Sequence, residues 1–193
     1  MHPLHYGLNS FNDDSCILVN CINLICMKRK FIFCALALTV VSSISLLGYR
    51  TYELTANKKK IESGIQELPA LPFQFFSKHS VASCKYTVIS YFSPDCDHCQ
   101  YMAKQIVIHR EDFKNTCILM ITPAKLEAAK LFASNYGLEN LSFVNVGTDP
   151  SFKFYKIFGS TVMPSFYVYG PDKKLLRKYT GETKIQNLIT KEN

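Results

Sequence analysis

The chain has 193 residues, of which 48% are hydrophobic and 19% charged, and its formal net charge is +7. This composition predicts a globular core and excludes a disordered chain. The 22 Lys and Arg residues occur in short groups spread along the sequence, which argues against nucleic-acid binding and favours an ordinary solvated surface.

The first hydrophobic segment is an uncharged run, FIFCALALTVVSSISLLGY, at residues 31–49. About 20 apolar residues in a helix span a hydrocarbon core of roughly 30 Å. The basic residues at 28–30 predict that the N-terminal flank stays in the cytoplasm and that everything after Arg50 lies outside it. A cleaved signal peptide is the competing interpretation. No clear small-x-small cleavage site follows the run, so we favour an uncleaved anchor over residues 27–50.

The segments on either side of this anchor differ in kind. Residues 1–26 are a doubtful extension, because Met27 followed by three basic residues is typical of the start of a signal or anchor. The alternative is a short cytoplasmic tail. Residues 51–67 are polar and rich in lysine and predict a tether, and residues 68–193 predict one globular domain.

Strand and helix patterns alternate within this domain. Strands are predicted at residues 86–92, 117–121, 141–146, 165–169 and 175–179. Helices are predicted at residues 96–108, from Pro123 to Tyr136 with Gly137 as the stop, at 150–158 and at 182–191. Alternation of this kind predicts an α/β fold with a central mixed β-sheet flanked by helices.

Only one pair among the eight cysteines, Cys96 and Cys99, has the C-x-x-C spacing. Cys96 falls where a buried strand gives way to a helix, and free N–H groups at a helix N-terminus favour the thiolate form. Cys99 lies one turn deeper on the same face. We therefore expect Cys96 to attack a disulfide and Cys99 to resolve the mixed disulfide. Between them, His98 would stabilise the thiolate and Asp97 would oppose it, or His98 is simply an exposed helix residue.

The segment YFSPDCDHC, residues 91–99, resembles the active-site segment of the thioredoxin superfamily, especially the membrane-anchored TlpA/ResA-like proteins. A second motif, GSTVMPS at residues 159–165, resembles the family's cis-proline loop. The resemblance implies a thioredoxin fold, a cis peptide bond before Pro164, and a Met163 backbone that pairs with an extended substrate. Two departures stand out: the chain has no Trp, and Ser90 occupies the position where many thioredoxins have a buried acid.

Metal binding is the alternative chemistry for the C-x-x-C pair. With His98 the motif supplies at most three ligands, whereas a closed structural zinc site needs four. Neither Cys84 nor Cys117 has a partner at ligand spacing. Cys117 is expected to be a small buried hydrophobe, and Cys84 a core residue or an extra thiol. We therefore expect no metal and no cofactor.

Taken together, these patterns predict a membrane-anchored thiol–disulfide oxidoreductase with its domain on the extracytoplasmic side. The resemblance implies that the membrane is a bacterial inner membrane and that this side is the periplasm. The resemblance implies that it reduces or exchanges disulfides of envelope proteins and is recharged by a membrane electron donor. An oxidant is the rival direction. The rival classes are a non-catalytic thioredoxin-fold binding module and a copper-handling module.

Overall fold

The computed structural model describes residues 13–76 and 84–189, with side chains from residue 27 onward. The chain divides into two units, Met1–Thr55 and Ala56–Asn193. Helix α1, Asp13–Gly64, has 52 residues and continues through most of the segment predicted as a tether. Its part Met27–Gly64 is long and apolar enough to cross a membrane, a test that a signal sequence also passes.

Three polar side chains within the apolar part of α1 are hydrogen-bonded to the helix itself. The Thr39 hydroxyl donates to the carbonyl of Leu36, and the Ser42 and Ser43 hydroxyls both donate to the carbonyl of Thr39. A hydroxyl bonded to its own helix does not need water. These residues therefore suit the hydrocarbon environment that the apolar run predicts.

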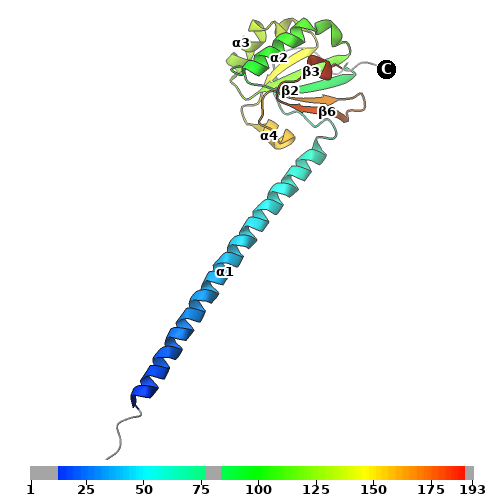
Figure 1. The fold of residues 1–193 in the computed structure, drawn as a ribbon. Coiled ribbons are helices and arrows are strands. Elements are labelled where there is room, and N and C mark those ends of the chain that lie inside the picture. The colour runs from blue at the N-terminus through cyan, green and yellow to red at the C-terminus, as the bar shows by residue number, and fades with distance from the viewer. Residues whose placement is uncertain (1–12, 77–83, 190–193) are drawn as a thin grey trace, which may run out of the picture. The chain divides into compact units, whose positions relative to one another are not determined.

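The second unit is built on a six-stranded sheet with the order β1-β4-β3-β2-β5-β6 (Figure 1). Strand β2 is parallel to β3, and β3 is parallel to β4. Strand β5 is antiparallel to both β2 and β6, and β1 is antiparallel to β4. The strands are β1 Gln74–Phe75, β2 Tyr86–Tyr91, β3 Thr116–Thr122, β4 Val144–Thr148, β5 Ser165–Tyr169 and β6 Leu175–Thr180. The predicted mixed sheet is thus confirmed.

Helices cover both faces of this sheet (Figure 1). The α2 face packs Val88, Met120 and Phe166 against α2 and α3. The α4 face packs side chains of the alternate strand positions against α4 and the segment after α1. The helices are α2 Asp97–Ile108, α3 Leu126–Asn135 and α4 Lys153–Phe158, with short 3-10 turns η2 Arg110–Asp112, η3 Leu138–Asn140 and η4 Ile185–Asn187.

Several predicted boundaries are confirmed. Strand β5 spans the predicted residues, and β2 and α2 differ from the prediction by one residue. Gly137 adopts a left-handed conformation, with φ of 69°, just after the α3 C-cap residue Tyr136. This is the position where glycine commonly ends a helix.

Helix starts are predicted less well, because side-chain caps and turns decide them. Pro123 lies outside α3: the Thr122 hydroxyl accepts a hydrogen bond from the Ala124 N–H, and the helix begins only at Leu126. Helix α4 begins at Lys153 rather than Pro150, because the Asp149 carboxylate accepts hydrogen bonds from the Lys153 and Phe154 N–H groups. In both places a local turn separates the strand from the helix.

Two other predicted elements are wrong in extent, and one strand was missed. The strand predicted at 141–146 lies at Val144–Thr148, because a turn closed by Val144 N–H and Leu141 C=O precedes it. The helix predicted at 182–191 is only η4 where the chain is described, and residues 190 and 191 lie outside that part. Strand β1 has two residues, too few for an alternating pattern to show in the sequence.

A disulfide joins Cys84 and Cys117, which corrects the interpretation of both residues. Cys117 lies on β3 opposite Thr87 of β2, and Cys84 lies two residues before β2. Parallel pairing of β2 and β3 therefore brings together cysteines separated by 33 residues. Spacing along the chain does not reveal such a pair, because the crossover that joins two parallel strands needs about a dozen residues or more but has no fixed length.

Candidate functional site

Cys96 lies at the junction of β2 and α2, as the sequence predicts. Its backbone is extended, with φ of −95° and ψ of 116°, and it is the N-cap residue of α2. Its carbonyl accepts hydrogen bonds from the N–H groups of Cys99 and Gln100, each at 2.9 Å. The thiol is free and partly exposed. It thus combines access with the electrostatic environment of a helix N-terminus, which favours an anion.

Cys99 occupies the opposite environment. Its side chain is 1% exposed and packs in the core with Met102 and Ile106. Burial, followed by a hydrogen bond with the Cys96 sulfur, raises the pKa of the Cys99 thiol to about 12, and a hydrogen bond from the backbone of Ser93 opposes this rise. At neutral pH the two cysteines are therefore unequal: Cys96 is accessible, while Cys99 is buried and protonated.

The loop before β5 lies against Cys96. The Cys96 thiol donates a hydrogen bond to the Met163 carbonyl over 3.7 Å, although the two residues are 67 positions apart. The peptide bond between Met163 and Pro164 is cis. Pairing of Tyr91 with Ser165 places the start of β5 beside the end of β2. The sheet register thus brings the two sequence motifs together.

His98 contacts a residue that the sequence did not indicate. Its Nδ1 atom lies 2.6 Å from Oε2 of Glu182, and the two side chains are 69% and 42% exposed. Glu182 follows β6 and is 84 positions away, so no local pattern could have predicted this pair. Asp97 is the acidic residue in the first turn of α2. His98 therefore has an acidic residue next to it in sequence, Asp97, and a second carboxylate in contact with its ring, that of Glu182.

Ser90 lies beneath α2. It is 1% exposed, and its strand neighbours Met120 and Phe166 belong to the same core as Cys99. Its hydroxyl has no hydrogen-bond partner in the described part of the chain. Asp149 is the only acid buried among the described residues, and its carboxylate caps α4. The α2 face therefore has no buried carboxylate among the described residues.

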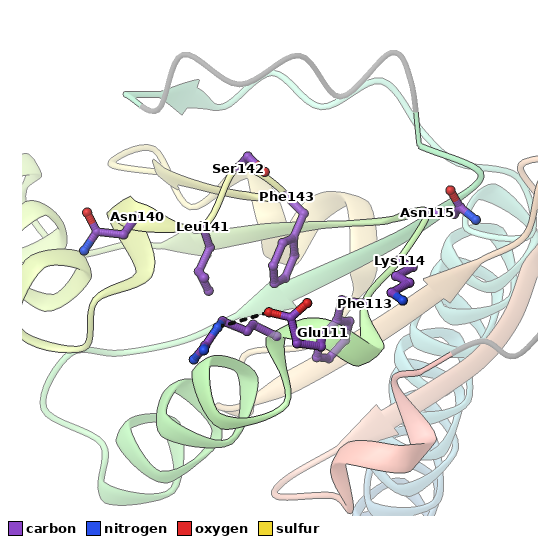
Figure 2. A pocket seen from close by; sticks show the side chains of 9 residues that line it. Glu111, Phe113, Lys114, Asn115, Asn140, Leu141, Ser142 and Phe143 are labelled. Atoms are coloured by element: carbon purple, nitrogen blue, oxygen red, sulfur yellow. Dashed lines mark ion pairs between the residues drawn. The ribbon is translucent and has the colours of Figure 1, made fainter.

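A pocket of about 380 Å³ lies next to the amino ends of β3 and β4 (Figure 2). Its lining comes from the segments that precede β3 and β4 and includes the stacked rings of Phe113 and Phe143, 5.6 Å apart. Arg110 and Glu111, which both line the pocket, form an ion pair with 3.4 Å between Nε and Oε1. None of the predicted site residues lines this pocket. The candidate site around Cys96 therefore lies outside this pocket.

No protein-family model and no curated protein sequence matches the chain. Solved structures do match it. A crystal structure of a thioredoxin-like superfamily protein has a TM-score of 0.52 at 18% identity, covering 64% of this chain and 91% of that one. A thioredoxin-like protein in its oxidized form has a TM-score of 0.52 at 16% identity, covering 62% and 87%. The chain has the thioredoxin fold.

A protein from Bacteroides thetaiotaomicron, described as a protein disulfide isomerase, has a TM-score of 0.50 at 14% identity, covering 64% of this chain and 82% of that one. At these identities the likeness establishes the fold. In the thioredoxin fold of this chain, the parallel strands β2, β3 and β4 end at the edge that carries Cys96. Ligands of open α/β sheets bind outside this edge.

Proposed function

We propose that the chain is a thiol–disulfide oxidoreductase that acts through Cys96 and Cys99. The observation that carries the proposal is the position of Cys96: a free, accessible thiol at the N-terminus of α2, hydrogen-bonded to Met163 and backed by the buried Cys99. Catalysis of thiol exchange needs an attacking thiol that a substrate disulfide can reach and a resolving thiol that is shielded from other reactants. Cys96 is partly exposed and meets the first requirement, and Cys99 is buried and meets the second.

The reaction proceeds in two exchange steps. The Cys96 thiolate attacks one sulfur of a substrate disulfide, forms a mixed disulfide and releases the other substrate sulfur as a thiolate. Cys99 then gives up its proton and attacks the Cys96 sulfur, which releases the second substrate thiol. Two electrons pass to the substrate, and the enzyme is left with a disulfide between Cys96 and Cys99. A dithiol donor in the membrane reduces this disulfide again.

Met163 and Pro164 position the substrate. In the free protein the Met163 carbonyl accepts a hydrogen bond from Cys96. An extended substrate segment that carries the attacked sulfur pairs with the Met163 backbone instead, next to Pro164. Backbone pairing gives affinity without requiring a particular side chain. This mode of recognition suits an enzyme that acts on several disulfide-containing proteins.

We assign reduction as the direction because of the contact between His98 and Glu182. A cationic imidazole between the cysteines would stabilise the Cys96 thiolate and make the couple oxidising. The Glu182 carboxylate at 2.6 Å and the neighbouring Asp97 compensate that charge. A reduction potential near −270 mV supports this direction, and one near −120 mV contradicts it.

We place the domain on the extracytoplasmic side of a bacterial inner membrane, with disulfide-containing envelope proteins as substrates. The support is the apolar part of α1, flanked on its N-terminal side by three basic residues. Labelling of Cys96 by a membrane-impermeant maleimide on intact cells tests whether the domain lies on this side of the membrane. Labelling of Cys96 only after cell lysis would contradict it.

The enzymatic proposal is tested with the full chain in detergent. We expect it to accelerate the reduction of insulin disulfides by dithiothreitol, and we expect Cys96→Ser to abolish this acceleration. Cys99→Ser is the matched variant, which should accumulate a mixed disulfide with the substrate because resolution is blocked. If the wild-type protein does not accelerate reduction, or if Cys96 resists iodoacetamide at neutral pH, the chain is a binding module instead.

A further inference from the structure

The disulfide between Cys84 and Cys117 has no part in the exchange chemistry proposed above. Its Cα atoms are 5.6 Å apart, within the usual range for disulfides. Cys84 precedes β2 and Cys117 is the second residue of β3, so the bond ties the amino ends of two parallel strands. Cys96 follows the carboxyl end of β2. Since β2 has six residues, the two sulfur sites lie about 20 Å apart along the strand.

The burial of the two sulfurs differs. Cys117 is 1% exposed on a strand whose residues are all buried, whereas Cys84 is partly exposed. An incoming thiolate can reach only the Cys84 sulfur, and attack there would expel Cys117 as a thiolate into an apolar interior. Burial of an unpaired charge is strongly unfavourable. Thiol exchange at this bond is therefore opposed by access and by the poor leaving group.

The bond also encloses the proposed active site in the sequence. The 33-residue separation between Cys84 and Cys117 contains β2, the Cys96–Cys99 segment and α2. Closing a loop of this length reduces the conformational entropy of the unfolded chain and so stabilises the folded segment that carries the dithiol. The disulfide lies at the amino ends of β2 and β3, whereas the reacting sulfurs lie beyond the carboxyl end of β2.

We infer that Cys84–Cys117 is a permanent structural disulfide, formed when the domain folds in an oxidising compartment and not reduced by the protein's own dithiol. Its formation needs an oxidant: two thiols of this chain become one disulfide while a donor protein disulfide of that compartment is reduced to two thiols. The inference does not depend on the proposed function. It concerns a different pair of cysteines, at the amino ends of β2 and β3.

The tryptic peptides of this chain allow a direct test. Cleavage after lysine places Cys84 in peptide 79–85 (HSVASCK), Cys117 in peptide 115–125 (NTCILMITPAK), and both Cys96 and Cys99 in peptide 86–104. The full chain is produced in bacterial membranes, quenched in acid, blocked with N-ethylmaleimide and digested without reduction. Mass spectrometry then identifies which peptides are linked.

We expect peptides 79–85 and 115–125 to be linked in nearly all molecules, and unchanged in a Cys96→Ser/Cys99→Ser variant. In a dithiothreitol titration of the native protein, we expect half-reduction of this link to need at least tenfold more reductant than half-reduction of peptide 86–104. Both peptides recovered as maleimide adducts would overturn the inference. So would half-reduction of the two pairs together, or a link from peptide 86–104 to either partner.

A variant separates the structural role from a catalytic one. Cys84→Ser/Cys117→Ser should lower the melting temperature and leave insulin reduction by the folded fraction within about twofold of wild type. A large loss of activity in folded protein would assign the pair to catalysis instead. If the variant does not fold, the peptide map of the unmodified chain still decides. A protein that has the Cys84–Cys117 disulfide but does not accelerate insulin reduction would refute only the proposed function. A protein that accelerates insulin reduction but lacks this disulfide would refute only this inference.

Discussion

The two faces of the sheet bury different kinds of side chain around the same strand. On the α2 face, Ser90 of β2 is buried with an unpartnered hydroxyl in the core that contains Cys99. On the α4 face, the next residue, Tyr91, stacks on Phe154 with ring centroids 4.0 Å apart. The buried carboxylate, Asp149, serves this second face by capping α4. Among the described residues, the face that buries Cys99 thus has no buried acid, and the buried acid of the other face has a structural role.

Removing the central aromatic of the α4 face should have the largest effect on stability. Phe154 is fully buried and contacts the rings of Tyr91 and Phe158. We expect Phe154→Ala to lower the free energy of unfolding by about 3–5 kcal/mol, measured by urea denaturation. The exposed neighbour Tyr155→Ala is the matched control, with a change within about 0.5 kcal/mol. Equal effects at the two positions would mean that α4 does not pack as described.

Asp149 and Ser90 test whether the buried polar groups of the two faces differ in role. We expect Asp149→Ala to lower the free energy of unfolding by about 1–2 kcal/mol, because the N–H groups of Lys153 and Phe154 lose their acceptor. Ser90→Ala should be nearly neutral, because the hydroxyl has no partner to lose. A slower resolution step in Ser90→Ala, measured by quenched flow, would instead assign the hydroxyl a part in the chemistry.

Alkaline pH should destabilise the reduced domain through Cys99. Burial raises the pKa of this thiol from 9.0 to about 12, so in that range the folded state holds a proton that the unfolded state has lost. The unfolded state then binds fewer protons, and stability falls as pH rises. The oxidised domain has no Cys99 thiol to titrate. We expect the melting temperature of the reduced form to fall more steeply between pH 9 and 10.5 than that of Cys99→Ser, while parallel slopes would contradict the burial of this thiol.

The smallest effect is expected at the exposed contact of the α2 face. Glu182→Gln removes the charge beside His98, which favours the Cys96 thiolate and makes the couple more oxidising. Exposed pairs contribute about 0.2–1 kcal/mol, which corresponds to a shift of roughly 5–20 mV for a two-electron couple. Equilibration with glutathione buffers measures the shift, and 0.5 M salt should reduce it. A shift in the reducing direction would contradict the role given to Glu182.

Much of the fold follows from local pattern. The apolar, β-branched run before Cys96 predicted β2 within one residue. For β5, both the first and the last residue were predicted correctly. Caps were harder to predict, because a carboxylate such as Asp149 can bond N–H groups four and five residues ahead and delay the helix. The predicted start of β4 was wrong because Leu141 lies in a turn, whose hydrogen bond competes with those between neighbouring strands.

By itself, the sequence determined the type of fold, the apolar N-terminal helix and the position of Cys96 at a helix start, because these depend on periodicity and spacing within one segment. The tertiary structure decided which distant residues meet. Parallel pairing of β2 and β3 joined Cys84 to Cys117, and antiparallel pairing of β2 and β5 brought Met163 to Cys96. Such contacts follow from strand register, which is set by the packing of the whole core and leaves no trace in local spacing.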